Sequence, residues 1–442
     1  MFDNKKIFIL GMARSGYEVA KLLATKNCDI LITDQKEQDK EKVEELKSLG
    51  IDVIITKNQE DLLDNSFDYV IKNPGIHIDV PPVLKAKKLN IPVINEAEVA
   101  YHYLPENVKI IGITGSNGKT TTTTLIYEVL KEANLPVHLG GNIGLPFSSL
   151  IDKIKERDIL VIELSAQQLH DFNHFKTDIS VLTNLIETHM EYFFTLENYM
   201  NSKKRIFKFH NKENLAIINY SDEYSMKITE DIASDKIYFS SKEKTDLYIK
   251  TDSIYYKEEQ IIKLDDIKLK GTHNYENSMC AIAIAKEFNV DNEIITKVLS
   301  DFSGVEHRIE YVNDVQGREF YNDSKSTNIK ATSIALGTFS KPTVLLLGGL
   351  DRQIVFNDLI PFMEHVKLIV GYGECKDSIK NFAITNNFKC EITETLEEAT
   401  KLAYKLSKKG DIILLSPACA SWDQFADFEE RGNKFKEVIN KL

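Results

Sequence analysis

A glycine-rich turn between a short apolar run and a helical pattern most constrains how this chain can fold. The run IIGIT leads into GSNGKTT at 115–121, and TTTLIYEVLKEAN follows. Such glycines permit a tight turn whose N–H groups point at phosphate oxygens, and the start of the helix adds partial positive charge. Lys119 can reach the β- and γ-phosphates of a nucleotide, while Thr120 can ligate Mg²⁺. The predicted nucleotide contacts are Gly115, Ser116, Asn117, Gly118, Lys119, Thr120 and Thr121.

This match covers only the GKT end of the usual phosphate-loop motif. Ile113 occupies the position of the motif's first glycine. A glycine-rich turn that happens to precede Lys-Thr, with no ligand, is therefore the alternative interpretation.

The chain of 442 residues is longer than a typical single domain of ~100–200 residues. Short apolar runs alternate with helical stretches along it, which predicts an α/β fold with parallel sheets. We expect three domains: a Rossmann-like domain at 1–105, a phosphate-loop ATPase-like domain at 106–302 and a second Rossmann-like domain at 303–442. The clearest predicted strands are 7–10, 29–33, 68–71, 92–94, 108–113, 158–164, 178–185, 215–219, 343–349, 367–373 and 411–417. The Tyr- and Ile-rich runs within 236–270 predict a small antiparallel excursion, and a helix is expected at about 273–288.

Charge and cysteine usage narrow the classes of function. Lys and Arg number 55 against 67 Asp and Glu, a net charge of −12, which argues against broad binding to nucleic acid. The five cysteines form no CxxC pair, which favours a reducing compartment. No secretory signal and no stretch of ~20 apolar residues stands out, so we expect a cytoplasmic protein without a membrane span.

A first glycine turn precedes the phosphate loop. It runs from Gly11 to Gly16 after the first predicted strand, and Asp34 ends the next strand. The pattern resembles a dinucleotide fingerprint, but Ala13 replaces the glycine that admits a pyrophosphate. A tight turn without a ligand, or binding of another nucleotide moiety, are the interpretations left open.

Three residues after the phosphate loop are candidates for metal chemistry. Glu163 ends a predicted buried strand, where an acidic residue can hold Mg²⁺. His189 is either a second metal ligand or an ordinary loop histidine. Lys203 falls on an apolar helical stripe with Leu196, Tyr199, Ile206 and Phe207, whereas Lys204 falls on the outer face. Burial would lower the pKa of Lys203 and leave a neutral amine that can react with CO₂ to form a carbamate; a snorkelling lysine is the alternative.

Eight spaced motifs resemble those of the Mur ligase family of ATP-dependent amide-bond ligases. The closest pattern is that of the members that add D-glutamate to UDP-N-acetylmuramoyl-L-alanine in peptidoglycan precursor synthesis. The motifs are GSNGKTT at 115–121, GGNIG at 140–144, ELSAQQL at 163–169, ETHM at 187–190, GTHNYEN at 271–277, EHRIE at 306–310, NDSKSTN at 322–328 and SPACASWDQFADFEERG at 416–432. Within ELSAQQL, Ala166 and Gln167 depart from the commoner family pattern, and Arg352 stands where lysine is frequent.

The resemblance implies roles for individual residues. It implies that the catalytic residues are Lys119, Lys203, His189 and Glu163. It also implies that two Mg²⁺ ions are bound by Thr120, Glu163, His189 and Lys203, the last as a carbamate. It assigns further ATP contacts to Asn277, Arg308 and Asp323. It implies that the UDP-substrate is bound by Ser15, Asp34, Lys36, Asn142, Ser165 and Gln168. It implies that the amino-acid substrate is bound by Lys325, Thr327, Arg352, Ser421 and Phe428.

The resemblance also implies the partners and the reaction. ATP, UDP-N-acetylmuramoyl-L-alanine and D-glutamate are the expected substrates of a monomer, joined through an acyl-phosphate intermediate. Without the resemblance, Asp323 and Lys325 read as a surface ion pair and Ser421 as the cap of a helix at WDQFADFEE. The rival functions are a sister ligase with another amino acid, a non-catalytic nucleotide-binding protein and a nicotinamide oxidoreductase.

Overall fold

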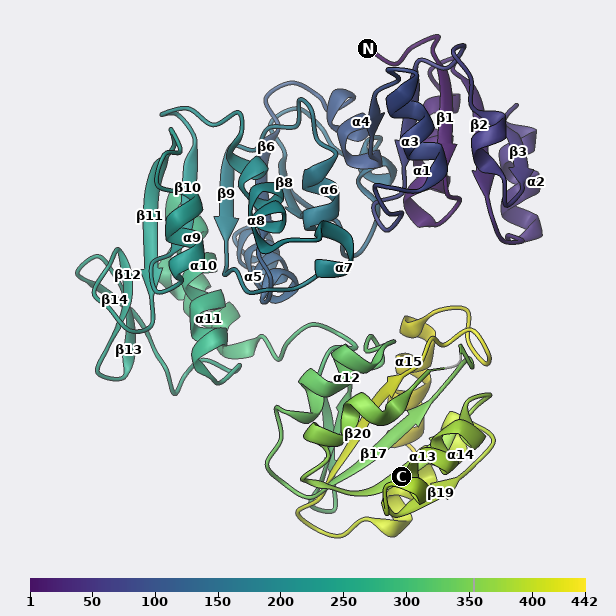
Figure 1. The fold of residues 1–442 in the computed structure, drawn as a ribbon. Helices are drawn as coiled ribbons and strands as arrows, with labels where there is room; N and C mark the ends of the chain where they lie inside the picture. Colours follow the sequence, from purple (N-terminus) through teal and green to yellow (C-terminus); the bar gives the residue numbers. More distant parts are fainter. Residues whose placement is uncertain (353) are drawn as a thin grey trace. The chain divides into compact units, whose positions relative to one another are not determined.

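The computed structural model describes residues 1–352 and 354–442, and it divides into two compact units, Met1–Phe302 and Ser303–Leu442. Each unit is an α/β assembly in which helices cover both faces of a sheet (Figure 1). In the described part of the chain, no helix is both long enough and apolar enough to cross a membrane.

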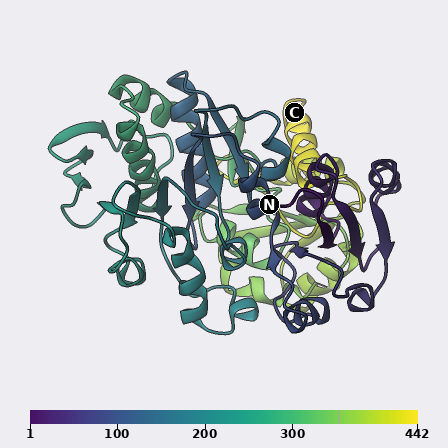
Figure 2. The ribbon, with the colours of Figure 1, turned by 90° about the horizontal axis from the view of Figure 1, so that it is seen from above.

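The first unit begins with a parallel sheet in the order β3-β2-β1-β4-β5. The apolar residues of its central strands β1 and β4 are buried, as is typical where crossover helices cover both faces of a parallel sheet. In Figure 2, which shows the structure from above, the start of this sheet is drawn in purple. The elements are β1 Lys6–Leu10, α1 Arg14–Ala24, β2 Asp29–Asp34, α2 Lys40–Ser48, β3 Asp52–Ile55, η1 Gln59–Leu62, β4 Tyr69–Lys72, α3 Pro81–Lys88, β5 Val93–Ile94 and α4 Glu96–His102.

A second sheet follows in the same unit, in the order β14-β13-β12-β11-β10-β9-β6-β8-β7. Its first half contains β6 Lys109–Thr114, α5 Lys119–Glu132, β7 Val137–Gly141, η2 Phe147–Leu150, β8 Ile159–Glu163, α6 Ala166–His170, β9 Ile179–Leu182, α7 Met190–Phe193, α8 Leu196–Lys204 and η3 Arg205–Phe207. Its second half contains β10 Leu215–Asn219, α9 Glu223–Ile228, β11 Asp235–Ser240, β12 Leu247–Lys250, β13 Ser253–Tyr256, β14 Glu259–Lys263, α10 Thr272–Glu287 and α11 Asn292–Asp301.

Side chains that alternate along the strands of this sheet point to opposite faces and pack into two separate hydrophobic cores. Ile111 and Val161 pack with α5, α10 and α11, while Ile110 and Leu160 pack with α6, α8 and α9. Strand β6 lies between β8 and β9 and runs parallel to both. The carboxyl ends of these three strands therefore share one edge, which is where ligands bind in open α/β sheets.

The second unit contains one sheet in the order β15-β16-β20-β17-β18-β19, in which only the β15–β16 pairing is antiparallel among the pairs described. One face packs on α12, α13 and η4, and the other on α14 and α15. The elements are β15 Glu310–Val315, β16 Arg318–Asn322, α12 Ile329–Leu336, β17 Thr343–Gly348, η4 Phe356–Phe362, β18 Val366–Tyr372, α13 Lys376–Thr385, β19 Cys390–Ile392, α14 Leu396–Leu406, β20 Ile412–Ala418 and α15 Phe428–Ile439.

Most of the predicted strands are confirmed, with two corrections. The expected antiparallel excursion is only partly right, because β11 pairs parallel to both β10 and β12, and the antiparallel pairs begin at β12–β13. The strand predicted to continue to residue 185 ends at Leu182. Its last residues turn instead toward the phosphate loop, as described below.

Candidate active site

The loop from β6 to α5 has the backbone of a phosphate loop. Gly115 and Gly118 have φ angles of 145° and 78°. A Cβ at Gly115 would lie 1.9 Å from Thr183 Oγ1, and one at Gly118 would lie 2.4 Å from Asn277 Oδ1. Both positions therefore require glycine on two grounds, conformation and space. Helix α5 begins at Lys119, and Thr120 is buried in its first turn.

The residues after β9 hold this loop in place. Asn184 accepts the Ser116 N–H at its backbone oxygen (2.8 Å) and the Asn117 N–H at its side-chain oxygen (3.0 Å). The Thr183 hydroxyl donates to the Asn117 carbonyl at 2.6 Å. The sequence prediction missed both clamp residues, because 183–185 was assigned to the strand. The sequence feature that could have identified them is the change from apolar to polar residues at the end of the buried strand.

Lys203 lies buried against the start of the phosphate loop. Its side chain sits on the predicted apolar stripe, and its Nζ donates to Thr114 Oγ1 at 2.9 Å and to the Gly115 carbonyl at 2.8 Å. Burial lowers the pKa of Lys203 well below its usual value; the charge of Lys119 adds to this, and that of Glu163 opposes it. A snorkelling side chain would reach water, so that alternative is wrong. The position therefore favours the neutral form of the amine beside the loop.

Tyr199 connects the Lys203 helix to the phosphate loop. Its hydroxyl lies 2.8 Å from Ser116 Oγ, and its ring lies 5.5 Å from Lys203 Nζ. Burial raises the pKa of Tyr199 to about 12, so the hydroxyl stays protonated at neutral pH. The ring of His189 lies 6.3 Å from that of Tyr199. The loop, Lys203 and His189 therefore belong to one neighbourhood at the strand ends.

Glu163 offers the clearest test of whether a cation fits. It is the last residue of β8 and is 1% exposed. Its Oε1 accepts a hydrogen bond from Asn142 Nδ2 at 2.7 Å, whereas its Oε2 is buried without a hydrogen-bond partner among the described residues. An orphaned buried carboxylate oxygen is costly unless a donor or a cation meets it. The donor set of Glu163 and Thr120 is of the oxygen type that Mg²⁺ prefers.

The residues predicted to hold the UDP end have observed local roles. The Asp34 carboxylate accepts the N–H groups of Met12 (2.8 Å) and Lys36 (3.0 Å) and so orders the first glycine turn. Ser15 lies within this turn, at the start of α1. A Cβ at Gly16 would lie 2.0 Å from the Gly11 oxygen, which explains the second glycine. On the other sheet, Ser165 and Gln168 form the capping box of α6.

In the second unit, Thr327 and Arg352 line one cavity of about 630 Å³ together with Ser333, Asp358 and Ala418. The Arg352 guanidinium lies 4.7 Å from the Trp422 ring. Two residues of the predicted amino-acid pocket are thus brought together from distant segments. Ser333 and Asp358 were not predicted, since neither belongs to a motif.

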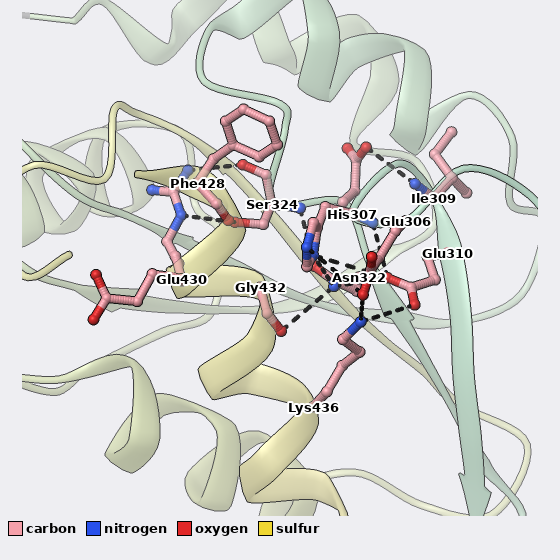
Figure 3. A network of polar contacts seen from close by, with 12 residues as sticks. Glu306, His307, Ile309, Glu310, Asn322, Ser324, Phe428, Glu430, Gly432 and Lys436 are labelled. Atoms are coloured by element: carbon pink, nitrogen blue, oxygen red, sulfur yellow. Dashed lines mark hydrogen bonds and ion pairs between the residues drawn. The ribbon is translucent and has the colours of Figure 1, made fainter. Parts of the chain in front are cut away.

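Asp323 is buried next to a polar network of the same unit, in which Figure 3 shows Asn322 between His307, Glu310 and Gly432. Asp323 accepts the Ile309 N–H at 3.2 Å and the Ser416 hydroxyl at 2.6 Å, and burial raises its pKa to about 6. Being 1% exposed, Asp323 is not part of a surface ion pair, so that alternative is wrong. Next to it, Asn322 bonds His307 at 2.9 Å and Glu310 at 2.9 Å.

The end of the last long motif is anchored by an arginine that the sequence prediction missed. Arg431 is fully buried and donates to Ser324 Oγ (3.0 Å) and to the carbonyls of Ser324 (2.8 Å) and Cys419 (3.0 Å). Phe428 begins α15, and its ring lies 5.6 Å from Lys325 Nζ. Asp427 caps this helix, and residues 421–425 form a turn, so the alternative of a helix capped by Ser421 is wrong.

The remaining predicted ATP contacts are divided between the units. Asn277 lies on α10, and its Oδ1 accepts the Thr122 hydroxyl at 3.1 Å, beside Gly118. Arg308 and Asp323 belong to Ser303–Leu442. Their contact with the nucleotide stays a prediction.

Comparison with known proteins adds independent evidence. Three family models match: a Mur ligase MurD-like N-terminal domain at 5–95, a Mur ligase middle domain at 113–285 and a Mur ligase glutamate ligase domain at 307–419. A Geobacillus sp. (strain WCH70) protein named UDP-N-acetylmuramoylalanine–D-glutamate ligase is 44% identical over 100% of this chain and 98% of its own. A Bacillus thuringiensis (strain Al Hakam) protein of the same name is 42% identical, with the same coverage.

A solved structure shares the fold. The UDP-N-acetylmuramate-alanine ligase MurC of Thermotoga maritima matches 99% of both chains with a TM-score of 0.61 at 19% identity. The expected fold class, with N-terminal, middle and C-terminal domains, is confirmed by these matches. With relatives above 40% identity along its whole length, the chain belongs to the Mur ligase family.

Proposed function

We propose that this protein is an ATP-dependent ligase that joins D-glutamate to UDP-N-acetylmuramoyl-L-alanine, a step of peptidoglycan precursor synthesis. The observation that carries the proposal is the 44% identity, over the full chain, to a relative named for that reaction. The intact phosphate loop and the buried Lys203 beside it support a catalytic rather than a merely nucleotide-binding role.

The domain roles follow the family pattern. Residues 1–105 would hold the UDP end through Ser15, Asp34 and Lys36, with Asn142, Ser165 and Gln168 from the next domain. Residues 106–302 would hold ATP, and residues 303–442 would hold D-glutamate through Lys325, Thr327, Arg352, Ser421 and Phe428. The cavity lined by Thr327 and Arg352 supports the last assignment. We further propose a cytoplasmic monomer.

A carboxylate is a poor electrophile, so the reaction needs the γ-phosphate of ATP to convert it to an acyl phosphate. The loop N–H groups and Lys119 would stabilise the phosphoryl group in transfer. The deprotonated amine of D-glutamate then attacks the acyl carbon, and phosphate leaves. Arg352 would orient D-glutamate by pairing with a carboxylate.

Thr120, Glu163 and His189 would hold Mg²⁺, which would neutralise phosphate charge when bound. The neutral amine of Lys203 can add to CO₂, forming an N–C bond and releasing a proton, to give an anionic carbamate. That anion would supply a further oxygen ligand where the protein otherwise presents an amine.

The test is phosphate release from ATP with UDP-N-acetylmuramoyl-L-alanine, comparing D-glutamate with L-glutamate and L-alanine. We expect release only with D-glutamate. Lys119→Ala should abolish release, whereas Lys131→Ala, which removes an exposed lysine from the same helix, should not. Release with another amino acid would indicate a sister ligase, and full activity of Lys119→Ala would contradict the phosphate-loop assignment.

A further inference from the structure

Helix α7, which follows His189, is short and strained at both ends. It spans four residues, Met190–Phe193. His189 before it and Phe194 after it have φ angles of 59° and 65°, in a region that side chains other than glycine rarely adopt. Such a conformation persists only where surrounding contacts impose it. The position of His189 therefore depends on what holds α7.

Some of the contacts to α7 come from the segment after β4 in the N-terminal sheet. The His77 ring meets the edges of the Tyr192 and Phe194 rings, with centroids 5.0 Å and 5.4 Å apart. The Ile76 carbonyl accepts the Tyr192 hydroxyl at 3.3 Å. Within its own domain, α7 is held by the Phe193 ring, whose centroid lies 5.5 Å from that of Tyr199, and by Asn198 Nδ2, which donates to the Phe193 carbonyl at 3.0 Å. The aromatic pairs and the partly buried hydrogen bond add support from the N-terminal domain.

Lys72, the last residue of β4, contacts both α7 and the segment that packs against it. Its side chain is 0% exposed, and its Nζ lies 2.9 Å from Asp171 Oδ2, 3.0 Å from the Ile76 carbonyl and 3.1 Å from the Tyr192 hydroxyl. One ammonium group therefore joins three segments: the end of β4, the end of α6 and the middle of α7. Two hydrogen bonds, to the Ile76 carbonyl and the Tyr192 hydroxyl, and the ion pair with Asp171 together surround the buried Nζ.

Both helices that Lys72 holds begin at residues of the proposed site. Helix α6 has Ser165 as its N-cap, two residues after Glu163, and α7 has His189 as its N-cap. We propose that Lys72 is a positioning residue for the phosphate and metal site, which sets the His189 loop through Tyr192. This inference rests on the proposed function, since it concerns the same site.

A purely structural ion pair would predict a different outcome. It would lower stability when broken, without altering the His189 loop or the response to metal in the folded protein. The inference instead predicts a loosened loop and a weaker metal site even where folding is intact. Partners that orient metal ligands typically change metal affinity by about 10- to 100-fold when removed.

The experiment uses the full chain and three variants. Lys72→Met leaves Asp171 buried without its cation, so the double variant Lys72→Met/Asp171→Leu removes both charges and is expected to fold. Lys204→Met is the matched control, because Lys204 pairs with Asp231 at 2.6 Å on the surface of α8. Amide hydrogen exchange of peptides covering 186–196, and Mn²⁺ binding in the presence of ADP followed by electron paramagnetic resonance, are measured on the folded variants.

In the double variant we expect exchange in 189–194 to rise and Mn²⁺ affinity to fall by about 10-fold. In the phosphate-release assay, the Mg²⁺ concentration that gives half-maximal activity should rise while the KM for D-glutamate stays unchanged. The control variant should match the wild type. Wild-type exchange and Mn²⁺ affinity in the folded double variant would overturn the inference. Failure of the wild type to release phosphate with D-glutamate would instead count against the proposed function.

Discussion

Two lysines are buried in the first unit, and their surroundings differ. Lys72 faces the Asp171 carboxylate and two neutral oxygens, whereas Lys203 donates to a threonine hydroxyl and a backbone carbonyl. Removing an ammonium group from water is expensive, and an opposite charge in contact offsets much of that cost. The first environment pairs the lysine with a carboxylate and joins segments, while the second favours the neutral amine that reaction with CO₂ requires. Burial by itself therefore does not say what a lysine does; its partners do.

The largest expected effect comes from deleting the amine of Lys203. Lys203→Ala should lower kcat by about 1,000-fold, since it removes a group at the site of phosphoryl transfer. Lys204→Ala, one residue further on the outer face of α8, should retain activity. Phosphate release at saturating substrates measures both. Partial recovery of Lys203→Ala with added acetate would indicate that an anion is needed there, and wild-type activity would reject the carbamate.

Breaking the pair at Lys72 should have the next largest effect, on stability. Lys72→Met should lower the free energy of unfolding by about 3 kcal/mol, because the Asp171 carboxylate remains buried without its cation. The double variant Lys72→Met/Asp171→Leu should recover most of that loss. Urea unfolding followed by circular dichroism measures both. If the single and double variants were equally unstable, the uncompensated carboxylate would not be the cause.

The same pair of lysines shows what could be predicted from the sequence. Lys203 was predictable because its helical stripe is local, and the burial of Tyr199, Ile206 and Phe207 confirms that stripe. Lys72 was not, since it ends an ordinary apolar run and its partners Asp171 and Tyr192 lie on helices α6 and α7, far along the chain. Local periodicity contains no information about which distant carboxylate meets a strand end.

The same reasoning applies to the fold and to the second unit. Continuous apolar runs such as 343–349 predicted buried strands, whereas the half-exposed β15 and the short β19 gave no comparable signal. Asp323 and Arg431 are buried by contacts between separated motifs, so their exposure was not readable from either motif alone. That Thr327 and Arg352 line one cavity was predicted only from the family resemblance, because no local pattern in the sequence links them.

Lys203 also predicts a dependence of stability on pH. Its pKa in the folded protein lies below its unfolded value of ~10.4, so the unfolded chain binds more protons between those two values. In that window the free energy of unfolding rises with pH by up to about 1.4 kcal/mol per unit from this group. The stability difference between Lys203→Met and wild type should therefore shift in favour of the wild type as pH rises toward 10. Denaturant melts in CO₂-free buffer test this, and a pH-independent difference would mean that Lys203 is buried as a cation.

The smallest expected effect on stability belongs to an exposed cation, Arg352. Because it stacks on Trp422 at the surface, Arg352→Ala should change the free energy of unfolding by no more than about 0.5 kcal/mol. It should nevertheless raise the KM for D-glutamate about 10-fold, a loss of ~1.4 kcal/mol, while the KM for ATP stays near the wild-type value. Lys341→Ala removes another exposed cation from the same unit, one that pairs with Glu319 and does not line the cavity. Equal increases in the D-glutamate KM for both variants would mean that the positive charge of the unit as a whole attracts the substrate. An increase confined to Arg352→Ala would show that Arg352 acts because it lines the pocket, just as each buried lysine acts through its partners.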